Sequence, residues 1–162
     1  MFGFSVDLHN SVRWVDGQRF AFLAESLAVV QSSSTQAQEF LGGARLESRA
    51  PIQHSDAVTA IAVGDEFIAT GQRGKRATLI LWHRATRQPK HKIKLEFGSE
   101  AVISLSFSTF PAKRFVALDG AEPQRIYLFS TEEPERYLLR EVGPGRWFKV
   151  AWGSEDLIAV LG

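Results

Sequence analysis

The stretch from Gln53 to Trp82, QHSDAVTAIAVGDEFIATGQRGKRATLILW, decides the fold. It contains three runs of small, β-branched or apolar residues, at 57–63, 67–70 and 78–82. Each run has the length and composition of a single β-strand. Turn-forming residues separate the runs, with Gly64-Asp65 in the first gap and Gly71 to Gly74 in the second. The stretch therefore predicts three consecutive strands joined by turns.

The same pattern returns further along the chain. Ala57-Val58 recurs after 44 positions as Ala101-Val102, and the run at 78–82 recurs after 47 positions at 125–129. A period in the forties with several strands per period is typical of WD40-type blades. We therefore predict an all-β protein, a partial WD40-type β-propeller of about three and a half blades of antiparallel sheet.

Four units follow this pattern. Their approximate bounds are 1–41, 53–95, 97–140 and 146–162, with an insertion or loop at 42–52. The fourth unit has two strands where the third has four. Because a propeller closes only by wrapping its blades into a ring, such a segment would leave apolar faces that its units cannot bury alone. We expect a piece of a longer protein or a truncated gene model, sticky or poorly folded in isolation.

Composition narrows the class of protein. An apolar content of 44% with 12 Phe and 4 Trp predicts a folded globular chain. The sequence has no cysteine, which excludes disulfides and thiolate sites and fits a reducing, intracellular setting. No apolar run approaches the ~18 residues of a membrane span, and the first ten residues lack the pattern of a signal peptide. We expect a cytoplasmic or cytoskeletal protein without membrane contact.

Several motifs resemble one group of WD40 proteins. HSDAVTAIAV, FIATGQ and LILW followed by VISLSF are similar to the first full WD40 repeat of the echinoderm microtubule-associated-protein-like family and of related cilia- and flagella-associated proteins. The most specific element is Ile68 to Gln72, and Phe2-Gly3-Phe4 looks like the end of the motif that precedes the family's first propeller. The family's Gly-His pair is here Gln53-His54, and its Trp-Asp pair is Trp82-His83. The resemblance implies a scaffold that binds tubulin or the ciliary doublet.

Three polar residues fall where a blade would use a buried hydrogen-bonded relay. His54, Thr70 and Trp82 could give one another partners in an apolar interior, from imidazole to hydroxyl to indole N–H. The usual fourth member, an aspartate before the last of these strands, is absent from 72–77, so we expect the relay to be incomplete. We interpret His54 as structural rather than catalytic or metal-binding.

Charge is distributed unevenly. Eight Lys or Arg and no acidic residue lie between residues 73 and 94. The net charge is −4 for residues 1–72 and −3 for residues 95–162. The candidate partner contacts lie around two turns: Arg73, Lys75 and Arg76 in the first, and Arg84, Arg87 and Lys90 in the second. Consecutive turns of a blade lie on opposite rims, so the two groups need not form one patch. They are either solvated turns that protect the sheet or a contact for an acidic polymer, and the resemblance implies tubulin.

Chemical motifs are missing from the sequence. The four His have no metal-ligand spacing with acids, Gly71 to Gly74 lacks the Lys and Ser/Thr of a phosphate loop, and no Ser lies in a nucleophile elbow. Aromatic residues are not interleaved with the cations as nucleic-acid binding would require. We predict no catalytic residue, metal, cofactor or small-molecule substrate. Two functions remain: a microtubule-associated or axonemal scaffold, and a general protein–protein scaffold without tubulin contact.

Overall fold

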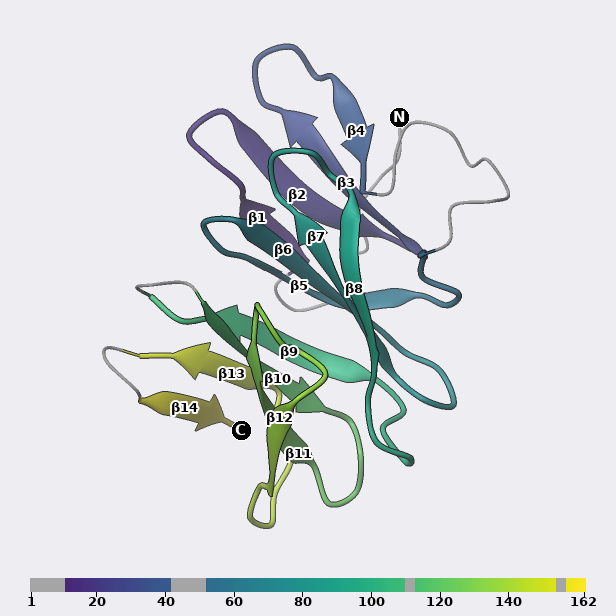
Figure 1. The fold of residues 1–162 in the computed structure, drawn as a ribbon, viewed down its shortest axis with the longest axis vertical. Coiled ribbons are helices and arrows are strands. Elements are labelled where there is room, and N and C mark those ends of the chain that lie inside the picture. The colour runs from purple at the N-terminus through teal and green to yellow at the C-terminus, as the bar shows by residue number, and fades with distance from the viewer. Residues whose placement is uncertain (1–10, 42–51, 110–112, 154–156) are drawn as a thin grey trace.

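The computed structural model describes residues 11–41, 52–109, 113–153 and 157–162. In these residues the chain forms fourteen β-strands and no helix, which confirms the expected all-β fold. Four sheets follow one another from the N-terminal to the C-terminal end of Figure 1. The motif Phe2-Gly3-Phe4 and all of the expected loop at 42–52 except Ile52 lie outside the described residues.

Each sheet is an antiparallel meander in which consecutive strands are neighbours. Sheet 1 contains β1 (Val12–Trp14), β2 (Arg19–Ala24), β3 (Leu27–Ser32) and β4 (Gln38–Phe40). Sheet 2 contains β5 (Val58–Val63), β6 (Phe67–Gln72), β7 (Thr78–His83) and β8 (Pro89–Lys94). Sheet 3 contains β9 (Val102–Phe107), β10 (Arg114–Asp119), β11 (Arg125–Ser130) and β12 (Tyr137–Glu141). Sheet 4 contains β13 (Lys149–Trp152) and β14 (Ile158–Leu161).

The first strands of successive sheets lie side by side. β1 contacts β5, β5 contacts β9, and β9 contacts β13. Side-chain hydroxyls join them, because Thr59 Oγ1 donates to the carbonyl of Val102 at 2.7 Å and Ser104 Oγ donates to the carbonyl of Val150 at 3.4 Å. The sheets thus radiate from a line of first strands, as the blades of a propeller do, and they do not close into a ring.

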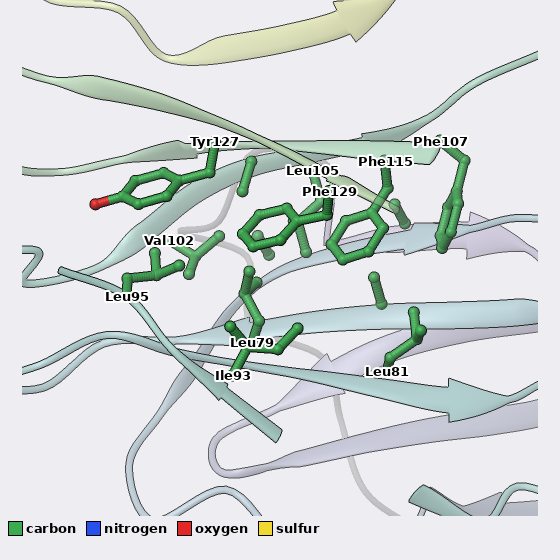
Figure 2. Close-up of a cluster of buried hydrophobic side chains, with 14 of the residues drawn as sticks. Leu79, Leu81, Ile93, Leu95, Val102, Leu105, Phe107, Phe115, Tyr127 and Phe129 are labelled. Atoms are coloured by element: carbon green, nitrogen blue, oxygen red, sulfur yellow. The ribbon is translucent and has the colours of Figure 1, made fainter. Parts of the chain in front are cut away.

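Strand β7 shows why the sheets stack. Its side chains alternate between two faces, and both faces are buried. Leu79 and Leu81 belong to the apolar cluster shared with sheet 3, whereas Ile80 and Trp82 belong to the cluster shared with sheet 1. Figure 2 shows the first cluster, in which aromatic rings of sheet 3 face the aliphatic side chains of sheet 2. Burial of each such side chain contributes about 1.5–3 kcal/mol.

Close packing between the sheets also explains Gly71. A Cβ placed on this residue would overlap the side chain of Val102 in β9. The glycine therefore lets the backbone of β6 approach the next sheet, as glycines in strands often do. The run expected at 67–70 accordingly continues as strand through Gly71 and ends at Gln72.

Candidate functional site

The three expected relay residues are joined by hydrogen bonds in sheet 2. Trp82 Nε1 donates to Thr70 Oγ1 at 2.7 Å, and Thr70 Oγ1 lies 2.6 Å from His54 Nε2. Thr70 and Trp82 are almost completely buried. Since Thr70 Oγ1 accepts from the indole, its own proton is available for His54 Nε2, which must then carry no proton. The relay runs in one direction, from indole to hydroxyl to imidazole.

Gln72 supplies the fourth member, so the expectation of an incomplete relay is wrong. His54 Nδ1 lies 2.9 Å from Gln72 Oε1, which also accepts from the backbone N–H of Ser55 at 3.0 Å. The Gln72 amide then donates to Ser55 Oγ at 3.2 Å. The amide oxygen of Gln72 takes the place of the aspartate carboxylate that such relays usually have, because either oxygen can accept a hydrogen bond from the imidazole N–H. An amide at this position carries no sequence signal of its own, because the pattern typical of the relay has an acid there.

The relay fixes the charge of His54. Burial lowers the pKa of His54 from its ordinary value of 6.5 to about 4, although the hydrogen bond to Gln72 acts in the opposite direction. The ring is therefore neutral near pH 7, as the relay requires. A neutral imidazole whose two nitrogens are both engaged with Thr70 and Gln72 has a structural role, and that role stays our prediction for the relay.

Sheet 3 uses a different buried network, which sequence reasoning missed. The positions equivalent to Thr70 and Trp82 hold Ala117 and Phe129, and Asp119 takes the position of Gln72. Asp119 is followed by Gly120, a pair typical of a turn, yet it is the last residue of β10 and is fully buried. The spacing of 47 residues between Gln72 and Asp119 is the signal that could have identified it.

Asp119 accepts hydrogen bonds from several directions. Its Oδ1 accepts from the backbone N–H groups of Ala121 and Arg125, at 3.2 and 2.7 Å. Its Oδ2 accepts from Arg125 Nε at 3.0 Å, from the Tyr127 hydroxyl at 3.2 Å and from the Ser99 hydroxyl. Burial raises the pKa of Tyr127, which keeps its hydroxyl protonated as a donor. The carboxylate therefore holds together three segments of sheet 3.

The first basic turn joins β6 to β7, at one end of sheet 2 (Figure 1). Arg73 Nε lies 3.3 Å from Asp56 Oδ1, and both side chains are largely exposed. Arg76 Nε donates to the carbonyl of Leu95 at 2.6 Å. Lys75, at the tip of the turn, is exposed. Two of these three cations thus make contacts within the protein.

The second basic turn joins β7 to β8 at the opposite end of sheet 2, so the six cations do not form one patch. Arg84 Nη1 donates to the carbonyls of Gly64 and Asp65, each at 3.1 Å. Lys90 Nζ lies 4.7 Å from the centre of the Phe67 ring, a cation–π distance. The Arg84 contacts fix the turn to the connection between β5 and β6, whereas Lys90, which was expected in this turn, lies in β8 and faces Phe67 of β6.

Arg87 is the unexpected member of this turn. Its side chain is buried, its φ is 61°, and its Nε lies 3.3 Å from Glu39 Oε2 of sheet 1. Burial lowers its pKa, and the carboxylate of Glu39 acts in the opposite direction. An arginine placed between two sheets in this way is poorly exposed to a partner protein.

No group of three or more His, Asp or Glu in the described ranges could hold a metal ion. An open groove of about 1160 Å³ lies between the turn after β10 and the loop after β12. Charges of both signs line it, from Glu122, Glu141 and Arg146. Nor does the described part of the chain contain a helix suited to crossing a membrane.

Comparisons with known proteins agree with this architecture. A scan against protein-family models finds no match. The ciliary WD repeat-containing protein ctxp80 of Euplotoides octocarinatus is 26% identical over 144 residues, which are 83% of this chain and 20% of that protein. The crystal structure of the RRP9 WD40 repeats superposes with a TM-score of 0.76 at 14% identity and covers 96% of this chain and 46% of that one. The structure of U3-55K superposes with a TM-score of 0.72 at 13% sequence identity and covers 98% of this chain and 50% of that one.

The chain spans about half the length of these solved structures and 20% of its curated relative. The structural matches establish the fold, and the match to the ciliary protein agrees with the repeats seen in the sequence. The narrower resemblance, to the echinoderm microtubule-associated-protein-like family, stays a prediction. The meandering sheets, their radial order and these matches together give the chain the fold of a partial WD40-type β-propeller.

Proposed function

We propose that this chain belongs to a non-enzymatic scaffold of the cilium that binds the microtubule wall. The observation that carries the proposal is the match to a ciliary WD-repeat protein over 83% of the chain. The stacked sheets supply a rigid body whose turns project at two rims, an arrangement suited to holding other proteins. The protein would then reside in the cytoplasm and cytoskeleton and act without a catalytic step.

The microtubule part of the proposal rests on charge. Sheet 2 carries eight cations and no acid between 73 and 94, in a chain whose flanking segments are acidic. Clustered cations raise the encounter rate with an acidic polymer, and the affinity falls as salt screens the attraction. Lys75 supports this reading most directly, because it is exposed at the tip of its turn.

Co-sedimentation of the natural full-length protein with stabilised microtubules tests the proposal. We expect pelleting that rises with tubulin concentration and weakens between about 50 and 200 mM salt, where the screening length falls towards 8 Å. A tagged copy in ciliated cells should lie along the axoneme. Absence of salt-sensitive pelleting would contradict microtubule binding and leave the scaffold interpretation standing.

A second candidate is a protein–protein scaffold without tubulin contact. It is favoured by the internal contacts of the cations, since Arg76, Arg84 and Arg87 bind or face groups of the protein itself. In that case the basic sheet is a solvated and internally paired surface. A reproducible set of partners that co-purifies with the full-length protein and lacks tubulin would favour this candidate.

A further inference from the structure

Strand β8 is the outermost strand of sheet 2 (Figure 1). In the described part of the chain its hydrogen-bonded neighbour is β7 alone, so one side of β8 is not paired with another strand. An edge strand of this kind presents backbone donors and acceptors along its free side. It can therefore pair with an extended segment of another polypeptide, which then adds a strand to the sheet.

The register of β8 shows which backbone groups face the free side. The Leu95 N–H donates to the Ala77 carbonyl at 2.9 Å, which makes these two opposite residues a hydrogen-bonded pair. Hydrogen-bonded and non-hydrogen-bonded pairs alternate along an antiparallel ladder. Lys94 and Lys92, one and three positions before Leu95, therefore belong to non-hydrogen-bonded pairs. Their backbone N–H and C=O groups point away from β7, towards the free edge.

The same two lysines give this edge its charge. Alternation places the side chains of Lys92 and Lys94 on one face of the strand, and both are exposed. Lys92 Nζ donates to the carbonyl of Gln53 at 2.7 Å, which leaves two of its three donors for another acceptor. Glu135, which contacts β8, lies 3.1 Å from His91 on the opposite face of the strand.

The outer strands of the other described sheets differ from β8. Strand β4 contains Glu39, β12 contains both Arg140 and Glu141, and β14 contains no charged residue. Strand β8 contains three lysines and no acidic residue. Among the described outer strands, β8 thus offers a free edge with charge of one sign.

The charge of this edge selects the kind of strand that it can accept. Lysines on an edge strand discourage pairing with a neutral or basic strand, because the ammonium groups would lose water or meet like charge. An acidic strand instead places carboxylates opposite the ammonium groups, and such cross-strand pairs are favourable. The lysines therefore act against most strands and in favour of an acidic one.

The backbone of the edge favours a polypeptide over another polyanion. The outward groups of Lys92 and Lys94 include carbonyl oxygens as well as N–H groups. A carbonyl oxygen repels the phosphate of a nucleic acid, whereas an extended polypeptide supplies an N–H for each carbonyl and a carbonyl for each N–H. The match of donors and acceptors and the match of charge thus point to the same class of ligand.

We propose that β8 binds an extended acidic polypeptide segment by strand addition, with acidic side chains at alternate positions opposite Lys92 and Lys94. Pairing ends towards Pro89, which has no N–H to donate and lies beside a shift in the register of β7 and β8. The inference goes beyond the proposed function and does not require contact with a microtubule.

Fluorescence anisotropy of labelled synthetic peptides, titrated with the natural full-length protein, tests this inference. The probe is a short peptide that alternates Glu and Val. We expect saturable binding that weakens as the salt concentration rises. Three control ligands should bind more weakly: a Gln–Val peptide without charge, a Glu–Val peptide with methyl groups on its backbone nitrogens, and a single-stranded oligonucleotide of equal charge.

Charge reversal in the protein tests the position of the contact. Lys94→Glu should weaken binding of the Glu–Val peptide by roughly 2- to 30-fold, because an attractive cross-strand pair becomes a repulsive one. The same variant should bind a Lys–Val peptide more tightly than the unmodified protein does, which a misfolded variant would not. The matched control is Arg140→Glu, which makes the same change in charge on the outer strand of sheet 3 and should leave binding unchanged.

Each other result overturns the inference. Absence of binding, or equal binding of the Gln–Val peptide, would show that the lysines do not select an acidic strand. Equal binding of the methylated peptide or of the oligonucleotide would show that main-chain pairing is not used. Equal weakening by Lys94→Glu and Arg140→Glu would assign binding to net charge alone. Peptide binding as expected, without pelleting on microtubules, would leave this inference standing and contradict the proposed function.

Discussion

Replacing Thr70 by valine should loosen sheet 2 more than the loss of one hydroxyl would suggest. The Thr70 hydroxyl is the only link between the indole of Trp82 and the imidazole of His54 among the described contacts. Both Thr70 and Trp82 are buried, so water cannot replace the missing oxygen. The variant leaves the indole N–H and His54 Nε2 without partners.

The magnitude follows from these two orphaned groups. Each buried polar group that loses its partner costs about 1–3 kcal/mol. Burial of the methyl group that replaces the hydroxyl offsets about 0.8 kcal/mol of this loss. We therefore expect a net loss of about 1–5 kcal/mol in the free energy of opening of sheet 2, which corresponds to roughly 5- to 5000-fold in the opening equilibrium.

Hydrogen exchange of the full-length protein, read on peptides that cover β6 and β7, measures this loss locally. The control is Thr70→Ser, which keeps the hydroxyl and loses only a methyl group. A double variant, Thr70→Ala with Trp82→Phe, should cost less than the sum of its single changes, because it removes both partners of one bond. In sheet 3 the positions equivalent to Thr70 and Trp82 are naturally occupied by Ala117 and Phe129, the same two residue types as in the double variant. Unchanged exchange in Thr70→Val would refute the relay argument.

Three further predictions concern neighbouring groups. Gly71→Ala should lower the thermal midpoint, since the new Cβ overlaps Val102, and a midpoint equal to that of the unmodified protein would show that the sheets can separate without cost. Because the pKa of His54 is lowered to about 4 in the folded protein, the unfolded chain binds the proton more tightly. The contribution of neutral His54 to the free energy of unfolding should therefore be complete above pH ~6.5 and decline as the pH falls towards 4. Urea titrations at several pH values should show a flatter dependence of this free energy on pH for His54→Gln than for the unmodified protein. Asp119→Asn should destabilise sheet 3 by about 3–5 kcal/mol, because it removes a fully buried carboxylate and leaves the partly buried Arg125 without its counter-charge, and calorimetry should detect this.

Much of the fold could be predicted because strand signals are local. Alternation, β-branched runs and turn residues place a strand without knowledge of its neighbours, and the run at 78–82 accordingly became β7. Errors occurred where a residue's role depends on the opposite strand. Asp119 follows the same local rules as a turn aspartate, yet pairing of β10 with β9 and β11 places it in the interior. The local sequence does not contain that information.

The candidate site divides in the same way. The sequence could identify His54, Thr70 and Trp82 as a set, because the repeat pattern gives each a position in the blade: His54 ahead of the first strand, and Thr70 and Trp82 within the next two. It could not identify Gln72 as their fourth member, since that depends on which side-chain oxygen reaches the imidazole. Nor could it distinguish exposed Lys75 from buried Arg87, two cations with the same charge in similar turns.

The amino-acid order alone determined that this chain forms short strands in repeats of about 44–47 residues, because hydrophobic alternation and turn chemistry act within a few neighbouring positions. Tertiary structure decided which polar groups meet inside the sheets and which side chains remain in water. Those outcomes depend on strand register and on the contact between sheets, which join residues 20 to 50 positions apart. Phe97 illustrates the difference: its sequence context is a turn, and only the surrounding hydrogen bonds make it a fixed, exposed ring.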